Sequence, residues 1–274
     1  MITDCKSILV DRAVFGSSNQ GAIKGYQLLG WSSGIDAEIS RELNQWAPTR
    51  LHQMETDGYQ LPWLAQAFPI GTNRMCVGRT FISGQEYSGR GGWNVVSTFV
   101  LFDPDQWLAY NYDALGVLQT AMALGHMRLP IDFRNGLLQQ VSMPATLPLP
   151  SARFFGASSG QADDHFQATP YPLQTWADKI ELGRRLILVG LNRPIAAVAN
   201  IIERMSPPAR KRFSFTTGLP LSIHRPFQLH CTDAALYRQQ LSLAGWLSDE
   251  VDETQATVEA ELSSGNRQGY RRDP

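Results

Sequence analysis

The sequence feature that most constrains the fold is a pair of apolar stretches separated by a glycine-rich segment. Residues 75–82 read MCVGRTFI and residues 93–102 read WNVVSTFVLF, and glycines stand between them at 84, 89, 91 and 92. Aromatic and β-branched residues favour extended backbone, and glycine allows the chain to reverse. The pattern therefore predicts a β-hairpin. The nearly continuous apolar run of 93–102 further predicts a central strand.

Strands and helices are predicted on both sides of this hairpin. The predicted strands are 7–15, 26–32, 185–190, 212–217 and 226–231, and the predicted helices are 36–47, 114–127, 173–184 and 194–205. The order strand, helix, strand over 185–217 is typical of a parallel βαβ unit. We therefore expect an α+β or mixed α/β fold, in which an antiparallel sheet with helices precedes a smaller βαβ-containing unit.

The 274 residues are enough for one large domain or two small ones. A change of composition after residue 145, where proline, serine and glycine become frequent, favours two units. We predict an N-terminal unit at 1–145, a linker or surface loop at 146–170 and a second unit at 171–245. The remaining 246–274 is acidic and then polar, which predicts a short exposed helix followed by disorder.

Composition excludes several classes of protein. Apolar residues make up 43% and charged residues 18%, as in a globular chain. The balance of 24 Lys and Arg against 25 Asp and Glu excludes a uniformly basic nucleic-acid binder. The three cysteines, Cys5, Cys76 and Cys231, are dispersed in apolar segments, which indicates reduced core residues. With no signal-peptide pattern and no apolar run of about 20 residues, a cytoplasmic protein outside the membrane is expected.

Motifs for catalysis and cofactor binding are missing from the sequence. It contains neither a G-x-S-x-G elbow nor a G-x-x-x-x-G-K-[ST] loop. Potential metal ligands at 163–165 and 224–231 lack paired spacing, and strand alternation places His230 and Cys231 on opposite faces. We therefore predict no catalytic residue, no cofactor and no metal.

The tip of the predicted hairpin is the first candidate binding element. It carries Glu86, Tyr87 and Arg90 on a glycine-rich backbone, and Trp93 follows at the start of the next strand. Such a loop resembles a binding element, and the alternative is a hairpin end whose charges are merely solvated. In an alternative interpretation, residues 84–92 belong to a nucleotide-binding domain or an enzyme, in which Glu86 and Arg90 act near Arg79.

A second candidate is the basic stretch at 184–225, where eight Lys and Arg face a single carboxylate. Its candidate binding residues are Arg184, Arg185, Arg210, Lys211 and Arg212. Arginine pairs well with carboxylates and phosphates, so an acidic protein surface, a nucleotide or a nucleic acid are all possible targets. The acidic segment 249–261 also offers internal compensation if it folds back.

Several blocks of the sequence resemble the GTPase-associated proteins of bacterial conflict systems, in their N-terminal and middle domains. The blocks are DRAVFG at 11–16, GYQLLGWSS at 25–33, EYSGRGGWNVV at 86–96, LPLP at 147–150 and FSFTTGL at 213–219. Arg12 and residues 22–24 depart from the expected pattern. The resemblance implies a partner protein encoded with a small GTPase and carries over no catalytic residue. We therefore expect a non-enzymatic adaptor or regulator that binds a protein partner, possibly a small GTPase.

Overall fold

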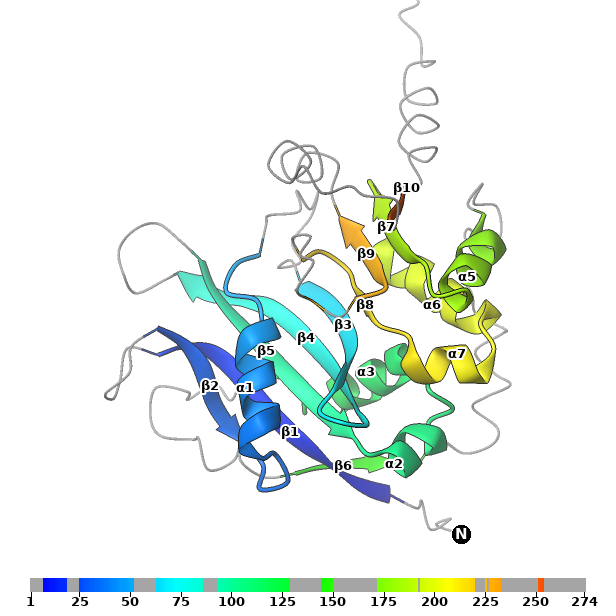
Figure 1. Ribbon diagram of the computed structural model, residues 1–274. Coiled ribbons are helices and arrows are strands. Elements are labelled where there is room, and N and C mark those ends of the chain that lie inside the picture. The colour runs from blue at the N-terminus through cyan, green and yellow to red at the C-terminus, as the bar shows by residue number, and fades with distance from the viewer. Residues whose placement is uncertain are drawn as a thin grey trace, which may run out of the picture.

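A computed structural model gives the fold of the chain (Figure 1). It describes residues 7–18, 25–51, 63–85, 93–128, 144–149, 172–191, 193–219, 225, 227–232 and 251–253. The strands are β1 (Ser7–Ser18), β2 (Gly25–Trp31), β3 (Trp63–Ile70), β4 (Arg74–Gln85), β5 (Trp93–Phe102), β6 (Ala145–Pro148), β7 (Arg185–Val189), β8 (Phe215–Thr216), β9 (Leu229–Thr232) and β10 (Val251–Glu253). The helices are α1 (Ala37–Trp46), α2 (Pro104–Ala109), α3 (Ala114–Ala123), α5 (Leu173–Glu181), α6 (Pro194–Arg204) and α7 (Pro207–Arg212).

The antiparallel half of the sheet is built around the predicted hairpin. β4 and β5 pair from Met75 opposite Phe102 to Gln85 opposite Trp93. β5 lies between β4 and β1, so the prediction of a central strand is confirmed. The strand order continues to β2 on one side and β3 on the other, while β6 pairs with the first part of β1.

The C-terminal strands extend the same sheet with parallel pairing. β7 pairs with β9 and β9 with β8, all parallel, and β8 joins β3 in antiparallel fashion. The βαβ connection through α6 is therefore present, but β9 lies between the two strands that it joins. A mixed sheet with helices confirms the α+β or mixed α/β fold class. The division into two units stays a prediction, since most of 146–170 lies outside the described residues.

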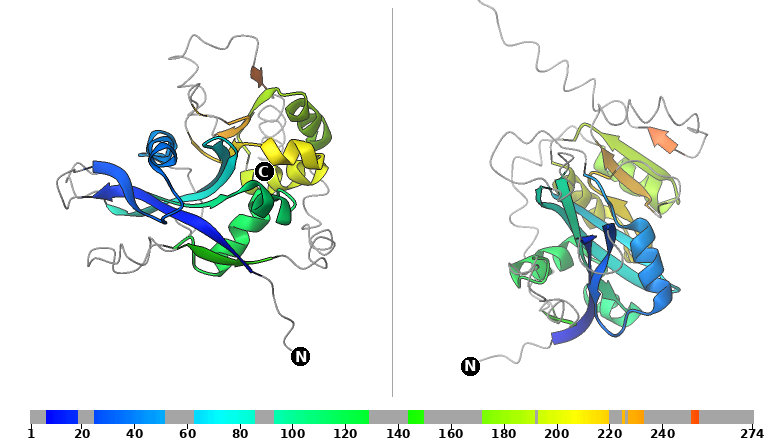
Figure 2. Two further views of the ribbon diagram at one scale, coloured as in Figure 1. Left: turned by 60° about the horizontal axis from the view of Figure 1, so that its bottom comes forward. Right: turned by 90° about the vertical axis from the view of Figure 1, so that its left-hand side faces the viewer.

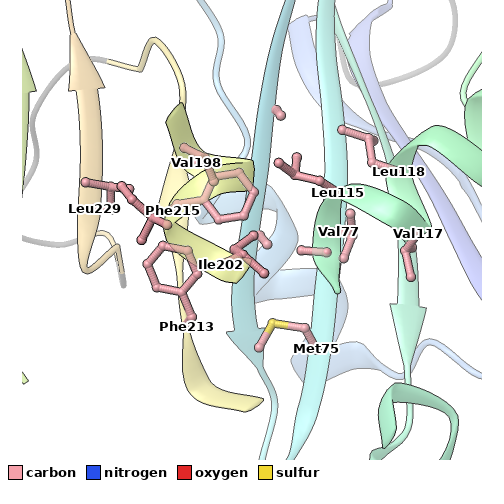
Figure 3. Close-up of a cluster of buried hydrophobic side chains, with 14 of the residues drawn as sticks. Met75, Val77, Leu115, Val117, Leu118, Val198, Ile202, Phe213, Phe215 and Leu229 are labelled. Carbon is pink, nitrogen blue, oxygen red and sulfur yellow. The ribbon is translucent and has the colours of Figure 1, made fainter. Parts of the chain in front are cut away.

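Most helices cover one side of the sheet, which we call the helix face. Its core joins α3 and α6 to strand residues such as Val77 and Phe215, with Leu115, Val117, Leu118, Val198, Ile202, Phe213 and Leu229 nearby (Figure 3). Residues from both halves of the chain thus share one apolar cluster. Burying each of these side chains contributes about 1.5–3 kcal/mol before the entropy of ordering is subtracted.

The opposite side, which we call the α1 face, is packed by α1 alone among the described helices (Figure 2). Ile39 and Leu43 of α1 contact a cluster that includes Phe68, Leu101 and Phe227. Alternation along each strand divides the side chains between the two faces. On β4, for example, Val77 lies on the helix face and Cys76 on the α1 face.

Local sequence explains how two of these helices begin. Asp36 accepts a hydrogen bond from the Ile39 amide at the start of α1. Asp113 caps α3 in the same way, accepting from the amides of Leu115 and Gly116. Carboxylates at these positions satisfy amides that lack a partner within the helix and interact favourably with its dipole.

Several elements were not predicted from the sequence. β3 contains Gln66 and Pro69, which break the expected strand pattern, and β6 lies among prolines. Helices α2 and α7 were not predicted either; they begin at Pro104 and Pro207, where the missing amide costs little. The predicted helix in the tail is wrong at 251–253, which form β10 on the edge of β7.

Candidate partner-binding surface

The hairpin tip is only partly described. Glu86, Tyr87 and Arg90 lie outside the described residues, so their role stays a prediction. Trp93 opens β5 opposite Gln85, and 43% of its surface is exposed. It is one of six large apolar side chains that are exposed among the described residues. The strand end at Trp93 therefore presents an aromatic surface beside the predicted tip.

The turn from α5 into β7 presents two of the predicted arginines. Gly183 has a φ of 79°, a left-handed conformation that ends α5 after its last turn. The Gly183 amide donates to the Ile180 carbonyl at 2.9 Å. Arg184 and Arg185 follow immediately and are both exposed. The backbone turn, rather than any side-chain contact, fixes where these two cations leave the fold.

Helix α7 carries the other three predicted cations, and they do different things. The Arg210 side chain turns back on α6, where its Nε donates to the Met205 carbonyl at 2.9 Å and its Nη2 to the Glu203 carbonyl at 3.0 Å. Arg210 therefore closes the end of α6. Lys211 and Arg212 are exposed.

The position of α7 is fixed from both ends. The Ser206 amide donates to a carboxylate oxygen of Glu181 at the end of α5. The Trp107 indole donates to the Lys211 carbonyl at 3.3 Å, and Phe213 is buried immediately after the helix. Lys211 and Arg212 are therefore held on an anchored segment.

Four exposed cations, Arg184, Arg185, Lys211 and Arg212, form what we call the basic edge. They lie at or just before the first residues of β7 and β8, which lie at the same end of the sheet. Hydrogen bonds align these residues, because the Leu186 amide donates to the Gln228 carbonyl and the Gln228 amide donates to Ser214. In the described part of the chain, the salt bridges are those of Arg74, and none involves the basic edge.

β5, which begins at Trp93, and β7, which begins at Arg185, run in opposite directions, so these two residues lie at opposite ends of the strands. Figure 1 shows the two strands in the sheet. One row of the sheet joins Phe99, Gly78, Gln66, Thr216, His230 and Ile187. Arg185 lies two residues to one side of this row and Trp93 six residues to the other, about 26 Å along the strands at about 3.3 Å per residue. A single partner that contacts both must span the sheet.

The acidic tail meets the basic edge through its backbone. β10 pairs in parallel with β7, with Val251 opposite Arg185 and Glu253 opposite Ile187. The expectation that the acidic segment folds back near the basic stretch therefore agrees with the position of 251–253. A strand of this length is a short cover for the edge of β7.

The predictions about the cysteines and His230 can be compared with where these residues lie in the core. Cys76 and Cys231 are buried free thiols, and Cys5 lies outside the described residues. Burial raises the pKa of Cys231 to about 12, which keeps it protonated and unreactive. Among the described residues there is no group of three or more potential metal ligands. His230 lies on the α1 face and Cys231 in the core of the helix face, as alternation predicted.

An ionic cluster on the α1 face of β1 and β4 was not predicted from the sequence. Arg74 contacts Asp11 at 2.6 Å and Asp103 at 2.9 Å, and its Nη1 donates to the Gly34 carbonyl. A Cβ on Gly34 would clash with the carboxylate of Asp11, so a side chain at this position would displace Asp11. Asp11 stands in one of the blocks that carry the family resemblance, which was the available signal.

A second missed feature surrounds Arg79 on the helix face. Its guanidinium carbon lies 5.0 Å from the ring centroids of both Trp63 and Phe81. Trp63 and Phe81 are directly opposite each other on β3 and β4, and Arg79 is two residues from Phe81. Arg79 and Phe81 are two residues apart on one strand, so the sequence indicated that they share a face. Their neighbour Trp63 was unknown because β3 was not predicted.

The described residues include no helix that is long and apolar enough to cross a membrane.

No curated protein and no solved structure is significantly similar to the chain. A family model does match, over β1 to the segment that follows α3, so the match includes the Asp11 and Arg79 clusters. It ends before the basic edge. Residues 10–128 match the model of the family described as GTPase-associated protein 1, N-terminal domain type 2.

Proposed function

We propose that this protein is a non-enzymatic adaptor or regulator that binds a partner protein, a small GTPase, through the basic edge. The family of residues 10–128 supports a role with a GTPase. The observation that carries the proposal is the set of exposed cations that no carboxylate neutralises within the described residues. Complementary charge steers association and fixes orientation, so such an edge favours an acidic protein surface.

The arrangement of the basic edge suits recognition more than chemistry. Arg184 and Arg185 are held by a backbone turn, and Lys211 and Arg212 lie on a helix anchored by Trp107. Side chains on fixed backbone lose less freedom on binding than side chains on a loose loop. Arginine also offers paired donors that match a carboxylate. A bacterial conflict system is the proposed setting, on the resemblance alone.

The test uses the full chain and the purified small GTPase encoded beside it, loaded with GDP or with a non-hydrolysable GTP analogue. Isothermal titration measures affinity at 50 mM and 300 mM salt. We expect binding that weakens with salt, and a loss of at least tenfold in the double variant Arg184→Glu and Arg185→Glu. The matched control is Arg41→Glu with Arg50→Glu, two exposed arginines outside the basic edge.

Three results would overturn the proposal. One is equal affinity of the GTPase for the wild type and the basic-edge variant. Another is an equal loss in the control variant, which would indicate a response to net charge. The third is tight, salt-dependent binding of a nucleic acid that the basic-edge variant alone abolishes, with no binding of the GTPase.

A further inference from the structure

The arginine on the helix face of β4 is held in an unusual position. Arg79 is half-buried, and its guanidinium carbon lies 5.0 Å from the ring centroid of Trp63 and 5.0 Å from that of Phe81. Trp63 and Phe81 are cross-strand neighbours on β3 and β4, so the guanidinium packs against two adjacent rings. Its Nε is buried and has no hydrogen-bond partner. Because the residue is partly exposed, solvent reaches the group at its Nη end.

The segment that follows α3 brings a second cation, Arg128, near this arginine. Met127 is fully buried over β5, where its sulfur accepts a hydrogen bond from Thr98 at 3.2 Å. On one side of this segment, Arg12 donates to the His126 carbonyl at 2.9 Å. On the other side, Arg79 lies close enough to the exposed Arg128 for that charge to lower its pKa, after the larger effect of desolvation.

Among the residues that the structure describes, no carboxylate forms a salt bridge with Arg79 or Arg128. The salt bridges found in the described ranges use Asp11 and Asp103, and both pair with Arg74. Arg79 is thus desolvated, close to a like charge and without a counter-ion among the described residues. This combination is unfavourable in the free protein, and an anion bound at the Nη end would relieve it.

We propose that Arg79, packed against the rings of Trp63 and Phe81 and assisted by Arg128, is a binding site for an oxyanion, a phosphate or carboxylate group. The planar, pre-oriented fork of Arg79 donates two parallel hydrogen bonds to such a group. Arg128 adds charge without fixed geometry. The site is separate from the basic edge, so it goes beyond the proposed function and stands or falls independently of it.

The experiment titrates the full chain with inorganic pyrophosphate and, separately, with a six-residue polyglutamate peptide. Binding is followed by calorimetry and by the NMR signals of the Trp63 indole and the Arg79 Nε–H. We expect at least one ligand to bind at millimolar concentration or tighter and to shift both signals. Comparing the two ligands distinguishes a phosphate source from a carboxylate source.

Three variants separate the contributions. Arg79→Lys keeps the charge but loses the fork and the stacking, and we expect at least tenfold weaker binding. Arg128→Gln, at an exposed position that leaves the contacts of Arg79 with Trp63 and Phe81 intact, should weaken binding about threefold. Arg41→Gln is the matched control on α1 and should bind as the wild type does.

Four outcomes would overturn the proposal. They are failure of both ligands to bind the wild type, unchanged affinity in Arg79→Lys, unchanged affinity in Arg128→Gln, and equal weakening in Arg41→Gln. Thermal unfolding of each variant identifies any loss of fold. If Arg79→Lys does not fold, Arg128→Gln and the Arg79 Nε–H signal of the wild type still decide the matter.

Discussion

Arg74 Nη2 lies 2.6 Å from Oδ2 of Asp11, and the Ser32 hydroxyl donates to the other oxygen of the same carboxylate at 2.6 Å. These contacts join β4, β1 and the segment after β2. Asp11 and Ser32 come from the two sequence blocks that open the family resemblance. The residues that carry the resemblance here therefore fix the relative positions of the first strands.

We expect Arg74→Met to destabilise the protein by about 3 kcal/mol, because it leaves the mostly buried Asp11 carboxylate without its cation. The side chains of Arg74 and Asp11 are 11% and 16% exposed. Urea denaturation measures the change. Glu203→Gln, at an exposed position outside the cluster, should stay within about 0.5 kcal/mol of the wild type. Wild-type stability of Arg74→Met would show that the ion pair contributes nothing.

Neighbouring cations on α7 should respond differently to substitution. Arg210→Ala removes two hydrogen bonds to carbonyls at the end of α6, so a loss of about 1 kcal/mol is expected. Lys211→Ala, at an exposed side chain, should change stability by less than about 0.5 kcal/mol. Thermal unfolding at fixed pH compares them. The assignment of Arg210 to a structural role fails if the two variants unfold at the same temperature.

The close approach of Phe99 to Gly78 should make this glycine irreplaceable by alanine. A Cβ at position 78 would lie 2.6 Å from the Phe99 ring, which cannot move easily in a packed core. We expect Gly78→Ala to cost about 1–3 kcal/mol. Adding Phe99→Leu should recover part of that loss, so chemical denaturation of the single and double variants should reveal coupling. Strictly additive effects would contradict the clash.

Buried His230 should make stability depend on pH. Burial lowers its pKa from 6.5 to about 3, with further lowering by Arg225 and then Arg185. The unfolded chain therefore binds a proton below pH 6.5 that the folded protein does not. Stability is complete above pH 6.5 and falls progressively as the pH drops from 6.5 to about 3.

The contribution of His230 is measured by comparison with His230→Gln, which cannot titrate. Between pH 8 and pH 5, the wild type should lose about 2 kcal/mol more than the variant. Urea denaturation at each pH gives both curves, and the carboxylates common to both proteins cancel in the difference. Parallel curves would mean that His230 does not remain neutral in the folded state.

Local patterns identified most elements correctly. The apolar run of 93–102 predicted a central strand, and the spacing of Ile39 and Leu43 predicted the buried side of α1. β3 escaped because Gln66 and Pro69 interrupt its pattern, although tertiary packing buries Gln66 completely. Prediction from local pattern fails where neighbours across the sheet, rather than adjacent residues, determine what is buried.

The candidate sites depended more heavily on the tertiary structure. The sequence identified the basic stretch, but it did not separate Arg210, which closes α6, from the exposed Lys211 one residue later. It also gave no sign that Trp93 and Arg185 lie at opposite ends of the strands, because strand direction and register are set by long-range pairing.

By itself, the sequence determined the hairpin, the helix spacings, the mixed α/β class and the family resemblance of the N-terminal part, since each follows from local patterns of residue type. Only the tertiary structure decided the partners of Asp11 and Arg79 and the inclusion of the C-terminal strands in one sheet. The physical reason is distance along the chain. Arg79 meets Trp63, and Arg74 meets Asp11, only after β3, β4 and β1 have folded together.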